Sequence, residues 1–151
     1  MGMRERDKSN AGVSIRDSGT ILLVDDDQMV RDLLKACLHN AGHEVTVASS
    51  GPEALSVIRT SCDSIRLLVT DLDMPEMSGI ELAQRARDSC SCPVMLISGK
   101  ITPPPAGSCV WDRFLAKPFT PSVFVEAVEQ MLGQSAERPA PGSTIPPSRQ
   151  I

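Results

Sequence analysis

The sequence predicts an α/β fold in which a five-stranded parallel β-sheet is doubly wound, with helices on both faces. Short apolar segments alternate along the chain with segments of helical periodicity. The apolar segments are continuous rather than interrupted at every second residue, which is typical of parallel strands buried on both faces. Aromatic residues make up only 3% of the 151 residues, so the core is expected to be aliphatic.

The first half of the pattern contains two strand–helix units. Residues 20–24 (TILLV) predict the first strand, and residues 28–41 predict a helix with its apolar residues on one face. Gly42 is a natural stop for that helix. Residues 44–48 (EVTVA) predict the second strand, and residues 52–60 predict a short helix with Pro52 in its first turn, where proline is well tolerated.

The second half continues the alternation. Residues 66–70 (RLLVT), 93–98 (PVMLIS) and 113–116 (RFLA) predict three more strands, and residues 79–88 predict a helix between the first two of them. The last helix is expected to begin after Thr120, a suitable N-cap followed by Pro121, and to end near Gly133.

The two ends of the chain differ in composition from the segment between them. Residues 1–18 are polar and charged, and residues 134–151 are rich in proline and serine. Such compositions do not bury enough apolar surface to fold. We therefore expect a flexible arm over 1–18, a folded domain over 19–133 and a disordered tail over 134–151.

Residues 99–112 (GKITPPPAGSCVWD) interrupt the pattern between the fourth and fifth predicted strands. Their three consecutive prolines disfavour an α-helix, because proline lacks an N–H donor and its ring clashes with the preceding turn. The fourth helix of the fold is therefore predicted to be truncated or replaced by an irregular loop.

Polar residues stand where the predicted strands end. Asp25 and Asp26 follow the first strand, Asp71 follows the third, and Ser98 and Lys117 occupy the ends of the fourth and fifth. Ligands of parallel sheets bind at this edge. Carboxylates gathered there would repel one another without a cation, and hard oxygen ligands suit Mg²⁺ or Mn²⁺. The ammonium and hydroxyl groups could bind a phosphoryl group, which a carboxylate can carry covalently.

Four motifs occur in order at these strand ends: ILLVDDD, LLVTDLDMPEMSGIEL, PVMLISG and FLAKPF. Over residues 19–133 they resemble the receiver domain of bacterial two-component response regulators, of the single-domain CheY-like type with a flavodoxin-like fold. The resemblance implies a protein that is not an enzyme but accepts a phosphoryl group and loses it slowly. The donor would be a histidine kinase or a His-containing phosphotransfer protein, and the output a contact with an unnamed downstream protein.

The resemblance also implies roles for individual acidic residues. Asp71 resembles the phosphoacceptor, and Asp25 and Asp26 resemble the acidic pair that binds Mg²⁺ directly or through water. The backbone carbonyl of Asp73 would complete the metal shell. In the family, the side chains of Asp73 and Lys100 would border the phosphoryl group, so a pair between them could alter its lifetime.

Three further positions match the family's switch machinery. Lys117 resembles the phosphate-binding lysine, and the bond from Lys117 to Pro118 is typically cis in the family. Ser98 resembles the switch hydroxyl, and Phe114 stands where the family keeps a switch aromatic. Phosphorylation would draw Ser98 toward the phosphate, and Phe114 would follow into the vacated space.

Other functions remain open. Asp71 and Asp73 form a D-x-D sequence after a strand, which also resembles the haloacid dehalogenase class of phosphatases. In that class the metal-binding acidic pair lies downstream, whereas here Asp25 and Asp26 lie upstream. A pseudo-receiver that binds a partner without phosphorylation is another alternative, as is a phosphate sink or a shuttle in a relay.

Composition and charge limit the partners and the cellular location expected for the chain. A net charge of −4 and a pI of about 5.1 argue against direct nucleic-acid binding. No apolar run approaches the roughly 20 residues of a membrane span, and the N-terminus lacks a signal peptide's apolar stretch. A cytoplasmic chain without membrane contact is expected, and its polar ends favour a free-standing chain over a piece of a hybrid kinase.

The cysteines are expected to be free thiols. They number five, an odd count, and their spacing is irregular, which is not typical of a disulfide framework. Two of them form a C-x-C sequence, but no second pair and no nearby histidine completes a zinc site. They are Cys37, Cys62, Cys90, Cys92 and Cys109.

Overall fold

The computed structural model describes residues 19–100, 103–104 and 110–136. The predicted N-terminal arm, most of the tail and the middle of the 99–112 segment lie outside the described residues. The elements, in chain order, are β1 (Thr20–Val24), α2 (Gln28–Asn40), β2 (Glu44–Ala48), α3 (Gly51–Ser61), the short 3₁₀ helix η2 (Cys62–Ser64), β3 (Ile65–Asp71), α4 (Gly79–Ser89), β4 (Val94–Ser98), β5 (Arg113–Ala116) and α5 (Pro121–Ala136).

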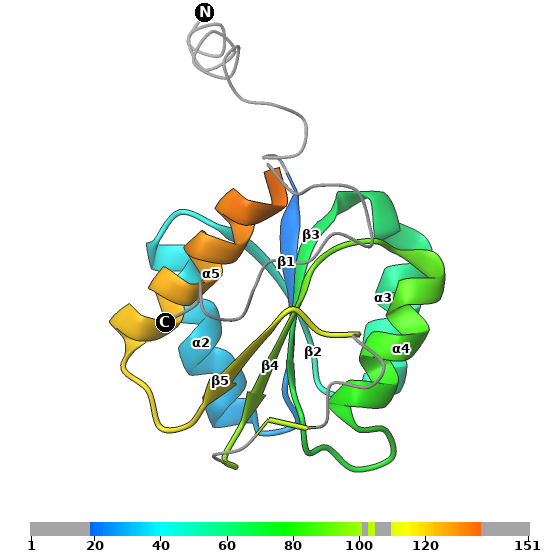
Figure 1. Ribbon diagram of the computed structural model, residues 1–151, viewed down its shortest axis with the longest axis horizontal. Coiled ribbons are helices and arrows are strands. Elements are labelled where there is room, and N and C mark those ends of the chain that lie inside the picture. Colours follow the sequence, from blue (N-terminus) through cyan, green and yellow to red (C-terminus); the bar gives the residue numbers. More distant parts are fainter. Residues whose placement is uncertain (1–18, 101–102, 105–109, 137–151) are drawn as a thin grey trace, which may run out of the picture.

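The five strands form one parallel sheet in the order β2-β1-β3-β4-β5. Helices α2 and α5 cover one face of the sheet, and α3 and α4 lie side by side on the other (Figure 1). The chain moves outward from β1 to β2 and then crosses back to β3. In such sheets the ligand site usually lies at the carboxyl ends of the strands on either side of this reversal, here β1 and β3. The predicted doubly wound fold is confirmed.

The core forms two aliphatic layers, one on each face of the sheet. Alternate residues of β1 point to opposite layers: Leu22 and Val24 face α3 and α4, whereas Ile21 and Leu23 face α2 and α5. All four are at most 1% exposed. Burial on both faces explains why the strands are continuous apolar runs in the sequence.

Helix boundaries agree with the predictions to within one residue except at the end of α5. Gly42 follows α2 with φ of 95°, a backbone conformation that favours glycine, and Thr120 Oγ1 accepts the N–H of Val123 as an N-cap. Gly133 was expected to end the last helix, but α5 continues to Ala136. Glycine in a helix lowers stability without removing its backbone hydrogen bonds, so its presence alone does not terminate the helix.

Helical periodicity places Leu33 and Val123 on the apolar faces of their helices, but both residues are exposed in the structure. The exposed fraction is 57% for Leu33 on α2 and 45% for Val123 on α5. An apolar helix face about 100° wide predicts which residues point toward the sheet. Residues at the edge of that face stay exposed where the sheet does not extend far enough to cover them. Both residues lie at the margins of their faces.

No helix is present among the described residues between β4 and β5, as the prolines predicted. Val110 is buried, and Trp111 packs against the layer formed with α3 and α4. The Asp112 carboxylate accepts the backbone N–H of Val94 at 2.8 Å and a hydrogen bond from Arg87 Nη2 at 2.9 Å. These contacts fix the position of the chain where it enters β5.

Of the described helices, none has the length and apolar content to cross a membrane.

Candidate functional site

Three acidic side chains meet at the carboxyl edge of the sheet. Asp25 directly follows β1 and is 2% exposed, Asp71 is the last residue of β3 and is 7% exposed, and Asp26 is exposed. One carboxylate oxygen from each lies within 4.8 Å of the others. Because β1 and β3 are neighbouring parallel strands, residues far apart in the sequence share this edge.

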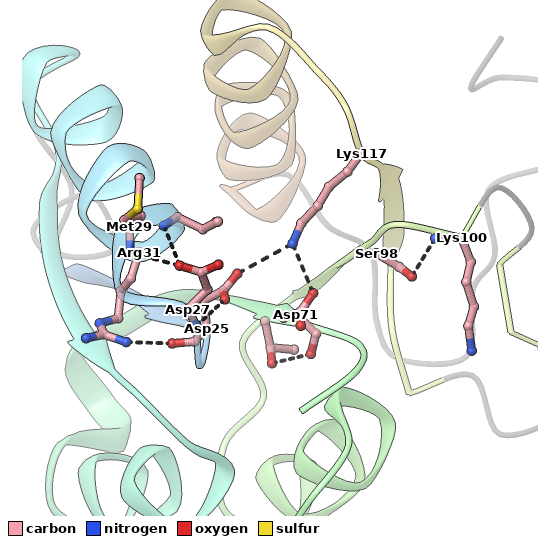
Figure 2. Close-up of polar contacts among 10 residues, drawn as sticks. Asp25, Asp27, Met29, Arg31, Asp71, Ser98, Lys100 and Lys117 are labelled. Atoms are coloured by element: carbon pink, nitrogen blue, oxygen red, sulfur yellow. Dashed lines mark hydrogen bonds and ion pairs between the residues drawn. The ribbon is translucent and has the colours of Figure 1, made fainter. Parts of the chain in front are cut away.

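Lys117 completes the cluster from the end of β5. Its Nζ lies 3.4 Å from Asp71 Oδ1 and 3.8 Å from Asp25 Oδ2, so the ammonium stands between the two carboxylates (Figure 2). Its backbone N–H donates to the carbonyl of Ser98 at 2.7 Å, which ties it to the end of β4. The bond from Lys117 to Pro118 is cis, as the family resemblance implied.

The turn between β1 and α2 holds Asp25 in place. The backbone N–H of Asp27 donates to Asp25 Oδ1 at 2.9 Å, and Arg31 Nη1 donates to the carbonyl of Asp25 at 2.8 Å (Figure 2). Asp27 also caps α2 by accepting the N–H groups of Met29 and Val30. The sequence analysis did not single out Arg31; the signal was an arginine one turn into the helix that follows the acidic run.

The loop after β3 packs closely beneath the site. Gly79 is buried at the start of α4, and its N–H donates to the carbonyl of Leu72 at 2.8 Å. A Cβ at this position would collide with the backbone carbonyl of Asp71. Glycine is therefore needed for α4 to begin directly against the end of β3.

Burial makes the two innermost carboxylates difficult to charge. It is the main reason that the pKa of the Asp71 carboxyl rises from 3.8 to about 6; Lys117 opposes the rise, and Asp25 and Asp26 add to it. Burial also raises the pKa of Asp25, although the Asp27 N–H and Lys117 act against this shift. A divalent cation would relieve the repulsion, and three carboxylate oxygens form the hard donor set that Mg²⁺ prefers. The residues present thus fit a magnesium site.

Ser98 and Phe114 lie on the same face of the sheet near the site. Phe114 pairs in register with Leu96, and Ser98 is two residues further along the same strand. Ser98 is fully buried, and its Oγ accepts the backbone N–H of Lys100 at 3.0 Å. Phe114 is half-buried and contacts Trp111, with ring centroids 6.3 Å apart.

An ion pair lies beside the site, between the β3–α4 loop and the residues after β4. Lys100 Nζ is 3.5 Å from Asp73 Oδ1, and both side chains are more than half exposed. The pair suggested by the sequence is therefore formed. The role of the Asp73 backbone carbonyl as a metal ligand stays a prediction.

Comparisons with known proteins agree with this geometry. The sequence profile described as "Response regulator receiver domain" matches residues 21–129. The chain is 33% identical over 120 residues to a "Chemotaxis protein CheY homolog" of Campylobacter jejuni, which covers 75% of this chain and 92% of that protein.

Solved structures show the same likeness. The receiver domain from hybrid histidine kinase CckA is 36% identical, with a TM-score of 0.67 over 76% of this chain and 99% of that one. The response regulator protein TrrA from Thermotoga maritima, in complex with Mg²⁺-BeF, is 28% identical, with a TM-score of 0.66 over 75% of this chain and 98% of that one.

Proposed function

This chain belongs to the response regulator receiver domain family, whose standard function is phosphorylation-based switching, and we propose that Asp71 is its phosphoacceptor. The observation that carries the proposal is the position of Lys117, whose ammonium stands 3.4 Å from a buried carboxylate at the end of β3. A cation fixed beside a nucleophilic carboxylate can neutralise the charge that a phosphoryl group brings.

The chemistry assigned to these residues is a phosphoryl transfer. A carboxylate oxygen of Asp71 attacks the phosphorus of a phosphohistidine, the bond to the histidine nitrogen breaks, and an acyl phosphate forms on Asp71. Lys117 then holds a phosphoryl oxygen. Since a carboxylate must be ionised to attack, the neighbouring positive charge favours the reactive form.

We assign metal binding to the carboxylates of Asp25, Asp26 and Asp71, with the backbone carbonyl of Asp73 as a further ligand. Bound Mg²⁺ or Mn²⁺ would neutralise charge on the carboxylates and on the incoming phosphoryl oxygens. Asp27 and Arg31 position this set, because both hold Asp25 through hydrogen bonds.

Ser98 and Phe114 are proposed to transmit the change. In the state described here the Ser98 hydroxyl accepts from Lys100, and a phosphoryl group on Asp71 offers it an acceptor to which it can donate instead. This hydrogen bond exists only in the phosphorylated state, so it shifts the equilibrium between two conformations. Phe114, on the same face, would follow, and the altered surface would bind a downstream protein.

The proposed donor is a histidine kinase or a His-containing phosphotransfer protein. Its docking is supported by exposed apolar side chains beside the site: Met29 is 80% exposed and Leu33, one turn further along α2, is 57% exposed. Helix α2 begins at the acidic turn that carries Asp25, so a protein seated on these side chains would reach Asp71. We propose that the chain itself turns over no substrate.

The test is the intact mass after incubation with acetyl phosphate and Mg²⁺. We expect one phosphoryl increment in the wild type, none in Asp71→Asn, none without Mg²⁺, and an unchanged increment in the exposed control Asp88→Asn. An unmodified but folded chain that still binds Mg²⁺ would instead support a pseudo-receiver. Sustained phosphate release from varied phosphoesters would support a phosphatase.

A further inference from the structure

Three cysteines come together at the opposite end of the sheet from Asp71. Cys62 lies in η2, just before β3, and Cys90 and Cys92 lie between α4 and β4. Cys62 Sγ donates to the carbonyl of Ser89 at 2.7 Å, and Cys90 Sγ donates to the carbonyl of Cys62 at 3.4 Å. Each of these two thiols thus contacts the backbone segment that carries the other.

The environment of Cys90 favours its thiolate. Interactions with the Cys92 thiol, the Cys62 thiol and the backbone N–H of Cys92 lower the pKa of Cys90 against the opposing effect of burial. The hydrogen bond with Cys90 raises the pKa of Cys62. Because the thiolate is the reactive form, this environment favours Cys90 over Cys62 as the nucleophile.

Cys90 and Cys62 differ in their exposure to solvent. Cys90 is 7% exposed and belongs to the core layer under α3 and α4, whereas Cys62 is half-buried at its margin. The burial of Cys90 hinders large thiols such as glutathione, whereas Cys62 at the margin is partly exposed. Intramolecular closure then competes well with outside partners.

We propose that Cys62 and Cys90 form a thiol-modification site that a hydroperoxide converts to a disulfide. The Cys90 thiolate attacks one oxygen of the hydroperoxide, the O–O bond breaks, and Cys90 becomes a sulfenic acid while water or an alcohol leaves. The Cys62 sulfur then attacks the Cys90 sulfur, and a second water leaves as the S–S bond forms. Two thiols are oxidised and one peroxide is reduced.

A disulfide between Cys90 and Cys92 is less favourable. The backbone at Cys90 is extended, with φ of −145° and ψ of 144°. With Ser91 extended as well, the Cα atoms of Cys90 and Cys92 would lie about 6.6 Å apart, near the upper limit of roughly 6.8 Å for a disulfide.

A thiolate metal site is also less favourable. A metal site needs several ligand atoms close together. Among the acidic, histidine and cysteine side chains of the described residues, three ligand atoms lie within 4.8 Å of one another only at Asp25, Asp26 and Asp71. The three sulfurs do not form such a group, which points to pairwise chemistry.

The modification would join the end of α3 to the end of α4. These helices already pack against each other, and the residues are 28 apart in sequence. A covalent link between them restricts the unfolded chain and stabilises the fold. The site acts independently of the proposed phosphorylation, because it lies at the amino ends of β3 and β4.

The experiment is peptide mapping of the full chain after brief hydrogen peroxide treatment of the folded protein, alkylation with N-ethylmaleimide in denaturant and digestion with trypsin without reductant. Cleavage isolates Cys62 in residues 60–66 (TSCDSIR) and the other two in residues 88–100 (DSCSCPVMLISGK). We expect the two peptides joined through Cys62 and Cys90, with Cys92 alkylated, and their separation by dithiothreitol.

Variants sharpen the assignment. Cys92→Ser is expected to retain the link and Cys37→Ser to leave its rate unchanged. Cys62→Ser should lose the link and leave a sulfenic acid on Cys90 that dimedone labels. In the wild type, Cys90 should react about tenfold faster than Cys37, a half-buried thiol on α2.

Other results would overturn the proposal even without a variant. They are a link within residues 88–100, equal oxidation of Cys37 and Cys90, or both thiols still alkylated after peroxide treatment of the folded chain. Stoichiometric Zn²⁺ binding by the reduced chain that protects both thiols would replace the disulfide with a metal site.

Discussion

Asp71 combines a buried position with a charge that the proposed chemistry needs. Its carboxyl has a pKa of about 6 in the folded chain against a usual 3.8, so ionisation favours the unfolded state. This unfavourable contribution is complete above pH of about 6 and disappears as the pH falls toward 3.8. A site built for transfer thus lowers the stability of the metal-free protein.

Replacing this carboxylate should therefore stabilise the metal-free fold. With EDTA present, Asp71→Asn is expected to increase the free energy of unfolding at neutral pH by roughly 1–3 kcal/mol. The gain should shrink as the pH falls below about 6, where the wild-type carboxyl is protonated. Thermal unfolding followed by circular dichroism across this pH range measures it, with exposed Asp88→Asn as the control. A gain independent of pH would contradict the electrostatic origin.

The pair between Asp73 and Lys100 is expected to control the lifetime of the phosphorylated state. Lys100 Nζ lies 3.5 Å from Asp73 Oδ1, and the two exposed side chains follow β4 and β3 at the edge of the sheet that carries Asp71. Asp73→Asn and Lys100→Ala should each speed dephosphorylation about two- to fivefold, the equivalent of one exposed ion pair. The rate of dephosphorylation is measured from the loss of the phosphoryl group after the phosphodonor has been removed. The double variant should match the singles; additive effects would show that the pair itself is not responsible.

At the scale of elements, the contact between Trp111, which precedes β5, and Phe114 within β5 can report switching. Trp111, the one tryptophan of the chain, contacts Phe114 at 6.3 Å between ring centroids. If Phe114 moves when Asp71 is modified, tryptophan fluorescence should change on adding beryllofluoride and Mg²⁺. The change should be absent in Asp71→Asn and reduced in Phe114→Leu. An identical response in Phe114→Leu would place the switch elsewhere.

The exposed apolar residues of α2 should affect phosphoryl transfer from protein donors but not from small-molecule donors. Met29→Ser and Leu33→Ser remove side chains that are 80% and 57% exposed, so folding should be unaffected. Transfer from a kinase should slow about tenfold, as expected when apolar contacts at an interface are lost. Phosphorylation by acetyl phosphate should stay at the wild-type rate. Val123→Ser, which changes a 45% exposed apolar residue on α5, is the control, and an equal loss there would dismiss α2 as the docking surface.

For the molecule as a whole, the acidic cluster should couple metal binding to folding. A ligand that binds the folded state alone raises its stability with concentration, by about 2.7 kcal/mol at a hundred times its Kd. We expect Mg²⁺ to raise the Tm of the wild type and to have little effect on Asp25→Asn or Asp71→Asn. The exposed variant Asp88→Asn should respond like the wild type. Equal responses of all four proteins would exclude this metal site.

The sequence by itself determined the sheet, its helices and the residues at its carboxyl edge. Continuous apolar runs such as Leu22–Val24 report burial on both faces, and parallel strands place their carboxyl ends together. Asp25, Asp71 and Lys117 could therefore be assigned to one site before any distance was known. Local signals of this kind depend on neighbours within one element.

The tertiary structure alone decided the features that depend on residues distant in sequence. It placed Leu33 beyond the edge of the sheet, extended α5 past Gly133, and joined Arg31 to the carbonyl of Asp25. It also brought Cys62 against Cys90, which the spacing of the cysteines did not indicate. Periodicity specifies the direction of a side chain, whereas its contacts depend on how far each neighbouring element extends and where it packs.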